Sequence, residues 1–357
     1  MKFDYVVGNP PYQEETVRKE MTSGQKASRS IFQNFQMEVD ELTSKSSVLI
    51  YPGGRWIQRA GRGMQKFGLE QINDPHLARL YFVAQAQRIF PSAGINDGIS
   101  IVVKNYAKTA MKFKYDYDDN GHVKSQVRTA PGDRIMLLNP EDEEIADKIV
   151  SFVKKNNLSF LSDSVLPRNL FGIESSFAEN NPDKVQLLST VKGKIDYSRY
   201  AKVLTNDQAG SKGRSKWFLI KRNDIPRNPN LVDKWKVIVI SANPGGQRRD
   251  NQLEVIDNHS AFGRSKVALK LLDTESEAEN LFKYCDSKII RFTMLLTNEA
   301  LTSFAKYTPD ILNYKNENPF IDFSKSIDLQ LKKLLNLTDE QYEYALNRVK
   351  PHLKEMN

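Results

Sequence analysis

The chain has 357 residues, a formal net charge of +8 and 39% hydrophobic residues. This length exceeds the usual range of a single domain, so we expect two domains and a small additional segment. The sequence shows no secretory pattern and no apolar run near the roughly 20 residues that cross a bilayer. Cys285 is the only cysteine, which excludes an internal disulfide, and no Cys/His spacing suggests a metal site. We therefore expect a cytoplasmic protein that has neither a membrane-spanning segment nor a metal site.

The first predicted element is the strand Tyr5-Val6-Val7, which leads through Gly8 into Asn9-Pro10-Pro11-Tyr12. In our interpretation, the Asn9 side-chain oxygen and the Pro10 carbonyl accept both N–H bonds of a planar amine. This favours the tetrahedral nitrogen of a methyl-transfer transition state. Tyr12 offers a ring on which an extruded base can stack, worth roughly 1–3 kcal/mol. The alternative is a plain turn, but the strand before the tetrapeptide and the aromatic residue after it favour a site.

A polar, basic segment from Gln13 to Ser30 follows, placed to close over a nucleotide or to hold phosphates. The next predicted elements are a helix over Ser30–Val39 and strands over Ser46–Pro52, Leu80–Val83 and Gly98–Val103. Arg88-Ile89-Phe90-Pro91 lies between the last two strands. In this order the segments resemble the gamma-class adenine-N6 DNA methyltransferases of restriction-modification systems.

The resemblance implies the site residues and the reaction. Asn9, Pro10, Pro11 and Tyr12 would be catalytic, and Phe90 would close on the other face of the flipped base. Without the resemblance, an Ile-Phe pair beside a strand is more often core. The implied reaction transfers a methyl group from S-adenosylmethionine to adenine N6 in double-stranded DNA. Cytosine N4 is the nearest rival, because the same mechanism serves any exocyclic base amine.

The donor pocket of that family precedes the catalytic loop, whereas only eight residues precede Asn9 here. None of the later glycine clusters is a G-x-G-x-x-G that opens a helix after a strand. We therefore expect a partial Rossmann-like methyltransferase sheet, its C-terminal half, with Tyr5-Val6-Val7 as an open edge that invites pairing. A second polypeptide would then bring the donor-binding half, or the chain is a fragment of a longer reading frame.

A hairpin and a long helix should follow this α/β layer. Lys112 to Tyr117 alternates polar and apolar residues up to Asp119-Asn120-Gly121, and Asn-Gly is a strong hairpin signal. Asn139 caps a predicted helix that has Pro140 in its first turn. We place the domain boundary just after this helix.

The basic residues concentrate in the middle of the chain. From Arg199 to Arg249 there are twelve basic residues against three acids. We interpret Gly210 to Trp217 as a mobile basic loop with an aromatic end, suited to contact phosphates and base edges. Arg214 and Arg248 or Arg249 are candidates to read guanine. The alternative is a solvated charged face. The proposed DNA-binding residues are Lys212, Arg214, Lys216, Lys221, Arg222, Arg248 and Arg249.

The remaining sequence predicts a mixed second half. Trp235 to Ile240 reads as a strand, and Glu277 to Lys288, ahead of Phe292, reads as a helical brace. Thr338 to Gln341 has the spacing of a capping box. The predicted fold is α/β with a methyltransferase half-sheet over 1–157, a mixed α+β target-recognition domain over 158–323 and a C-terminal helical segment over 324–357.

Two other function classes remain open at this point. The chain can be a non-catalytic DNA-recognition subunit, or a methyltransferase of the same tetrapeptide that acts on a glutamine amide or on RNA. The long basic second half favours DNA over the latter. No paired-acid and lysine site indicates a nuclease.

Overall fold

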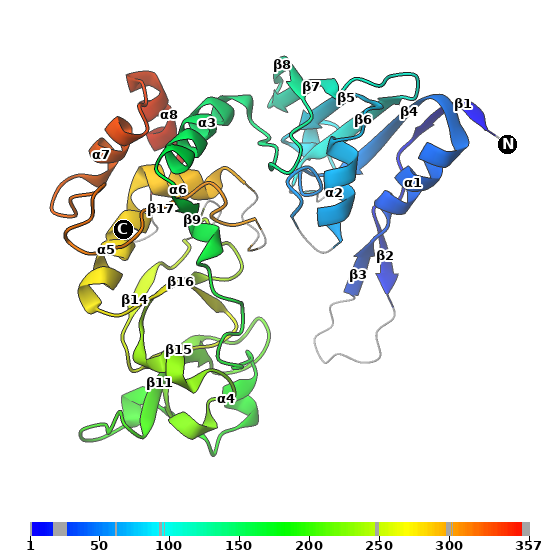
Figure 1. Ribbon diagram of the computed structural model, residues 1–357. Coiled ribbons are helices and arrows are strands. Elements are labelled where there is room, and N and C mark those ends of the chain that lie inside the picture. Colours follow the sequence, from blue (N-terminus) through cyan, green and yellow to red (C-terminus); the bar gives the residue numbers. More distant parts are fainter. Residues whose placement is uncertain are drawn as a thin grey trace. The chain divides into compact units, whose positions relative to one another are not determined.

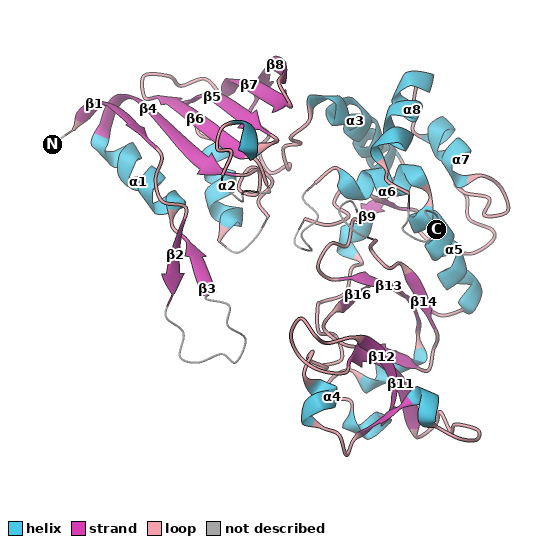
Figure 2. Cartoon of the chain, turned by 180° about the vertical axis from the view of Figure 1, so that it is seen from behind, coloured by secondary structure: helices cyan, strands magenta, loops and turns pink. Residues whose placement is uncertain are grey.

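The computed structural model describes residues 2–16, 27–60, 63–92, 95, 97–246, 250–297, 301 and 303–351. They belong to two compact units, Met1–Glu143 and Glu144–Asn357. Both units combine strands and helices (Figures 1 and 2). The division falls in the first turn of helix α3 (Pro140–Lys155) rather than just after it. None of the described helices is long and apolar enough to cross a membrane.

The first unit is built on a six-stranded sheet. In order across the sheet, its strands are β1 (Phe3–Gly8), β4 (Thr43–Pro52), β6 (Ile99–Asn105), β5 (Leu77–Val83), β7 (Lys112–Asp119) and β8 (His122–Thr129). Strands β1, β4, β5 and β7 run in one direction, and β6 and β8 run in the other. The carboxyl ends of β1, β4 and β5 therefore lie at the same edge of the sheet.

Two helices, α1 (Phe32–Leu42) and α2 (Met64–Ile72), pack on one face of this sheet (Figure 1). Phe32 of α1 meets Phe67 of α2 edge to face, with ring centroids 5.6 Å apart. Both rings also contact Tyr51 of β4. These aromatic contacts join both helices and the strand in one core, because each buried ring removes a large apolar area from water.

A buried cation ties α1 to the same face. Lys104 of β6 is fully buried, and its Nζ lies 2.8 Å from Asp40 Oδ2 and 2.6 Å from Asp74 Oδ2. Asp40 also accepts a hydrogen bond from the Tyr106 hydroxyl. Removing one partner of such a buried group leaves an uncompensated charge, so the set fixes the position of α1 on the sheet.

The opposite face of the sheet is apolar near β1. Phe3, Tyr5 and Val7 alternate with residues that face α1, and they are 47%, 67% and 79% exposed. Strand β1 is also an outer strand of the sheet, hydrogen-bonded on one side only to β4 within the described residues. This combination of an open edge and a bare apolar face is one that proteins normally cover.

Two hairpins accompany the sheet. In the first, β2 (Gln13–Thr16) pairs with β3 (Ala27–Ser30), so the polar segment after Tyr12 begins and ends in paired strands. Its residues 17–26 lie outside the described residues. Because Ser30 belongs to β3, helix α1 begins two residues later than predicted. In the second hairpin, β7 and β8 join through Asn120 and Gly121, both with positive φ, as predicted.

The second unit contains two small sheets that share a core. The first sheet has the order β10 (Val185–Leu187), β12 (Ser215–Lys221), β11 (Tyr200–Asn206) and β15 (Ser260–Phe262). The second sheet has the order β14 (Glu254–Ile256), β13 (Trp235–Ile240) and β16 (Lys266–Leu272). Phe171 and Phe262 meet edge to face at 5.2 Å in the core that these sheets enclose. A short pair, β9 (Ser159–Phe160) and β17 (Pro309–Asp310), lies near the helices.

The helices of the second unit are α3, α4 (Phe177–Asn180), α5 (Glu275–Asp286), α6 (Lys288–Leu295), α7 (Ile327–Leu334) and α8 (Asp339–Arg348). The capping box at Thr338 is confirmed at α8, and a second one at Thr274 starts α5. The predicted brace corresponds largely to α5, and the extended backbone of Ser287 separates α5 from α6. Helices α7 and α8 pack on α6, so the C-terminal segment belongs to this unit.

Candidate active site

The tetrapeptide begins directly after β1, at the carboxyl edge of the first unit's sheet. Asn9 and Pro11 are exposed, and Pro10 is half-buried. The Asn9 carboxamide makes no hydrogen bond to any residue that the structure describes. It is therefore free to receive a ligand, as an amine acceptor must be. Strand β1 sets the direction in which the loop leaves the sheet, and its register on β4 brings Gly8 beside Leu49.

Tyr12 is held more firmly than Asn9. Its ring is half-buried against the core of the first unit, and its carbonyl accepts a hydrogen bond from the Ile31 N–H at 3.1 Å. The pairing of Gln13 with Ser30 follows at once and closes the loop onto α1. The hydroxyl oxygen of Tyr12 is buried and has no hydrogen-bond partner among the described residues. Burial also raises the pKa of Tyr12, so the hydroxyl stays neutral near pH 7.

Phe90 lies after β5, at the same sheet edge as the tetrapeptide. It follows the 3₁₀ turn η1 (Ala86–Arg88), its N–H donates to the Ala86 carbonyl at 2.9 Å, and its ring is half-buried. Strands β4 and β6 separate β1 from β5, which puts the two strands about 14 Å apart at roughly 4.8 Å per strand. The sheet thus brings Tyr12 and Phe90 to one edge, and only the loops can set the distance between their rings.

The predicted DNA-binding residues of the second unit that the structure describes fall into two groups. Lys212 and Lys221 are exposed, and neither forms an ion pair with a described residue. Lys216 pairs with Asp207 at 2.7 Å, and Arg222 is half-buried and pairs with Asp233 at 2.7 Å. The backbone N–H of Arg214 also donates to Asp207, and its guanidinium donates to carbonyls of its own loop. Among the predicted DNA-binding residues that the structure describes, Lys212 and Lys221 are therefore the cations most available to phosphates.

The basic region differs from the prediction in one segment, and two of its predicted residues are not described. The predicted mobile loop from Gly210 to Trp217 is wrong at its end, because Ser215 to Lys221 forms β12 and pairs with β11 along its whole length. Trp217 is consequently half-buried in a strand. Arg248 and Arg249 lie outside the residues that the structure describes.

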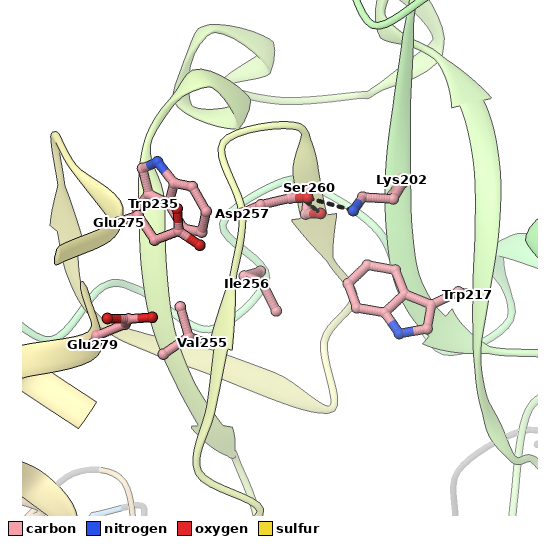
Figure 3. A pocket seen from close by; sticks show the side chains of 9 residues that line it. All are labelled: Lys202, Trp217, Trp235, Val255, Ile256, Asp257, Ser260, Glu275 and Glu279. Atoms are coloured by element: carbon pink, nitrogen blue, oxygen red, sulfur yellow. Dashed lines mark hydrogen bonds and ion pairs between the residues drawn. The ribbon is translucent and has the colours of Figure 1, made fainter. Parts of the chain in front are cut away.

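A hollow in the second unit was not predicted. It has a volume of about 390 Å³ and is lined by Lys202, Trp217, Trp235, Val255, Ile256, Asp257, Ser260, Glu275 and Glu279 (Figure 3). Lys202 is paired with Asp257, which leaves two carboxylates from the start of α5 at the rim. Although burial opposes it, hydrogen bonds from Lys202 and Ser260 hold the pKa of Asp257 below its usual value. The hollow is therefore unsuited to phosphate. The only signal in the sequence was the pair of tryptophans.

One family model matches part of the first unit. Residues 1–90 match the model of the Eco57I restriction-modification methylases. The match contains Asn9, Pro10, Pro11 and Tyr12 and ends at Phe90. No curated protein matches the chain.

Several solved structures that match parts of the chain come from restriction-modification systems. The methyltransferase subunit of a type I system from Streptococcus thermophilus is 15% identical over 44% of this chain and 36% of that one, with a TM-score of 0.23. The type IIG restriction endonuclease BpuSI is 9% identical over 90% of this chain and 48% of that one, at 0.33. The type IIL enzyme MmeI in complex with DNA is 7% identical over 99% and 55%, at 0.39. The chain thus spans about a third to just over half of their lengths.

Proposed function

We propose that this chain carries the catalytic loop and the target-recognition unit of a restriction-modification DNA methyltransferase that methylates the N6 amine of a flipped adenine. The observation that carries the proposal is the exposed Asn9 at the carboxyl end of β1, within the region that matches the methylase family. Asn9 and Pro10 accept the two amine hydrogens, while Tyr12 and Phe90 stack on the base.

The residues of this chain act by holding the amine in a reactive geometry. An exocyclic amine is a poor nucleophile because its lone pair is conjugated with the ring. Two acceptors beside it favour the tetrahedral nitrogen, whose lone pair is available for attack. Pro10 contributes a carbonyl from a residue with a fixed φ, which limits the motion of that acceptor. Adenine N6 is the proposed amine, and the same geometry serves cytosine N4.

The methyl donor of this chemistry is S-adenosylmethionine, which supplies an electrophilic methyl group when bound. The described residues of the first unit do not fit it. On the open side of β1 they provide neither a strand nor a glycine-rich turn to hold an adenosine. We therefore propose that the donor-binding half comes from outside these residues, as a second polypeptide or as another part of a longer chain, and adds a strand to the edge of β1. The exposed Phe3, Tyr5 and Val7 support this, because a partner would bury them.

The proposed role of the second unit is to hold duplex DNA. Its exposed Lys212 and Lys221 would contact phosphates, which position the protein without reading sequence. Base-specific contacts from Arg214, Arg248 or Arg249 belong to the same proposal.

The experiment is donor-binding calorimetry on the full chain, alone and with the product of the adjacent upstream gene. We expect S-adenosylmethionine to bind only when both polypeptides are present. Val7→Lys, at the open edge, should abolish that gain, whereas Val127→Lys, on the exposed strand β8, should leave it intact. Strong binding by the chain alone would contradict the split arrangement.

A further inference from the structure

The structure links Phe90 to a buried carboxylate. Asp118, near the end of β7, is 5% exposed. Its Oδ1 accepts hydrogen bonds from the Arg88 guanidinium and, at 2.8 Å, from the Gly121 N–H. Its Oδ2 accepts the Tyr81 hydroxyl at 2.9 Å. One carboxylate therefore joins strand β5, the turn of the β7–β8 hairpin and the η1 turn that precedes Phe90.

The η1 turn has few other constraints. Its backbone is closed by bonds from the N–H groups of Arg88, Ile89 and Phe90 to carbonyls of the same turn. Ala86 is fully buried and anchors one side, and Ala84 N–H donates to the Asp118 carbonyl at 2.9 Å. Ile89 is exposed, and Pro91 has no N–H to donate. The Arg88 side chain is thus the anchor nearest to Phe90 on its exposed side.

The hairpin turn is shaped to complete this contact. Gly121 has a φ of +92°, which directs its N–H to Asp118, and a Cβ at this position would lie 3.5 Å from Arg88 Nη2. The Asn120-Gly121 pair therefore does more than reverse the chain, because it also supplies one of the donors that hold the carboxylate in place.

We infer that the Arg88–Asp118 pair is a positioning device that holds Phe90 at the angle required to stack on the extruded base. This inference rests on the proposed function. The pair does not touch the base, so it acts only through the backbone of the η1 turn. The expected effect of breaking it is part of the stacking contribution, a fall of roughly 5- to 20-fold in methyl transfer.

A neighbouring ion pair on β7 offers a matched control. Two residues earlier on β7, Asp116 is equally buried and accepts Arg79 of β5, with Nε 2.6 Å from Oδ2. Arg79 lies within β5 and outside the η1 turn. Arg79→Gln therefore removes the same kind of ion pair to a buried carboxylate of β7 without releasing Phe90.

The test compares Arg88→Gln, Arg88→Lys and Arg79→Gln in the full chain. Hydrogen exchange of the segment 84–91, measured without DNA, reports the turn itself. Methyl transfer to unmethylated plasmid DNA, with the donor-binding polypeptide present, reports the base. We expect Arg88→Gln to accelerate exchange of the Ile89 and Phe90 amides about tenfold and to lower kcat with little change in KM. Arg88→Lys should partly restore both the slow amide exchange and kcat, and Arg79→Gln should change neither of these two quantities.

Equal effects of Arg79→Gln and Arg88→Gln would overturn the inference, since the pair would then be a general brace of the sheet. Unchanged exchange in Arg88→Gln would overturn it as well. Phe90→Ala separates this from the proposed function. If Phe90→Ala leaves methyl transfer intact, the stacking role fails, and with it the inference that the pair serves a base. If Phe90→Ala lowers methyl transfer but Arg88→Gln does not, only the positioning inference fails.

Discussion

The Tyr12 ring and hydroxyl should have separable effects. The buried hydroxyl lacks a partner among the described residues, and an unsatisfied group of this kind costs roughly 1–3 kcal/mol. Tyr12→Phe removes the group together with that cost. We therefore expect this variant to be as stable as the parent or more stable by about 1 kcal/mol, with unchanged methyl transfer.

Tyr12→Ala removes the ring as well. Burying an aromatic side chain fully is worth about 3–5 kcal/mol, so a half-buried ring contributes about 2 kcal/mol to unfolding. Its loss as a stacking surface adds roughly 1–3 kcal/mol to the transition state, or about 5- to 150-fold in kcat/KM. Urea denaturation and methyl-transfer kinetics on the folded fraction measure the two effects separately. A destabilised Tyr12→Ala variant with a normal kcat/KM would show that the ring serves only the core, and the reasoning would be refuted.

Four other outcomes follow from the same contacts. Asn9→Ala should abolish methyl transfer while the chain keeps its urea midpoint and DNA affinity, because the Asn9 carboxamide is exposed and bonds to no described residue; a large loss of stability would mean that Asn9 has a structural role. Val7→Lys should prevent association with the donor-binding polypeptide in analytical ultracentrifugation. It should shift the thermal midpoint of the chain alone by no more than about 2 °C, since exposed substitutions usually cost under about 0.5 kcal/mol. Unaltered association would place the interface elsewhere. Lys212→Ala and Lys221→Ala should each reduce the slope of log DNA affinity against log salt concentration by about 0.9, whereas Lys288→Ala, at another exposed lysine, should not. Equal slopes in all three variants would show that Lys212 and Lys221 lie outside the DNA interface. Burial lowers the pKa of Lys236 to about 7, so the unfolded chain binds more protons than the folded chain between about pH 7 and 10, and stability should rise with pH across that range. Lys236→Met should flatten this rise in urea denaturation measured at several pH values. An unchanged dependence of stability on pH would show that Lys236 is charged in the folded chain.

The local elements of the first unit were predictable because each has a strong local signal. Strands β1 and β6 are rich in β-branched and aromatic residues, and β4 and β5 contain such residues in their second halves. The Asn120-Gly121 turn and the Asn139 cap have side-chain and backbone requirements that a sequence displays directly.

Features that depend on distant residues were not predictable. The place of β6 between β4 and β5 is a property of the whole sheet. The burial of Lys104 requires Asp40 and Asp74 to converge from two other segments. The β2–β3 hairpin is polar on both strands, so it lacks the alternation that marks a half-buried strand.

The candidate site was predictable to a similar extent. The sequence singles out Asn9 and Tyr12 as candidates because their tetrapeptide directly follows a predicted strand. It does not indicate that Arg222 is engaged by Asp233, nor that Asp118 holds the turn before Phe90, because both contacts join residues 11 and 30 positions apart. Contacts between side chains far apart in the sequence depend on the whole fold, whereas a motif of consecutive residues can be recognised in the sequence alone.

Nucleoside mass spectrometry of DNA treated with the chain, the upstream gene product and isotopically labelled S-adenosylmethionine tests the central claim most directly. The account predicts labelled N6-methyladenine that disappears with Asn9→Ala. Labelled N4-methylcytosine would move the reaction to the other amine, and no labelled base with either form of the chain would contradict a catalytic role for the Asn9 loop.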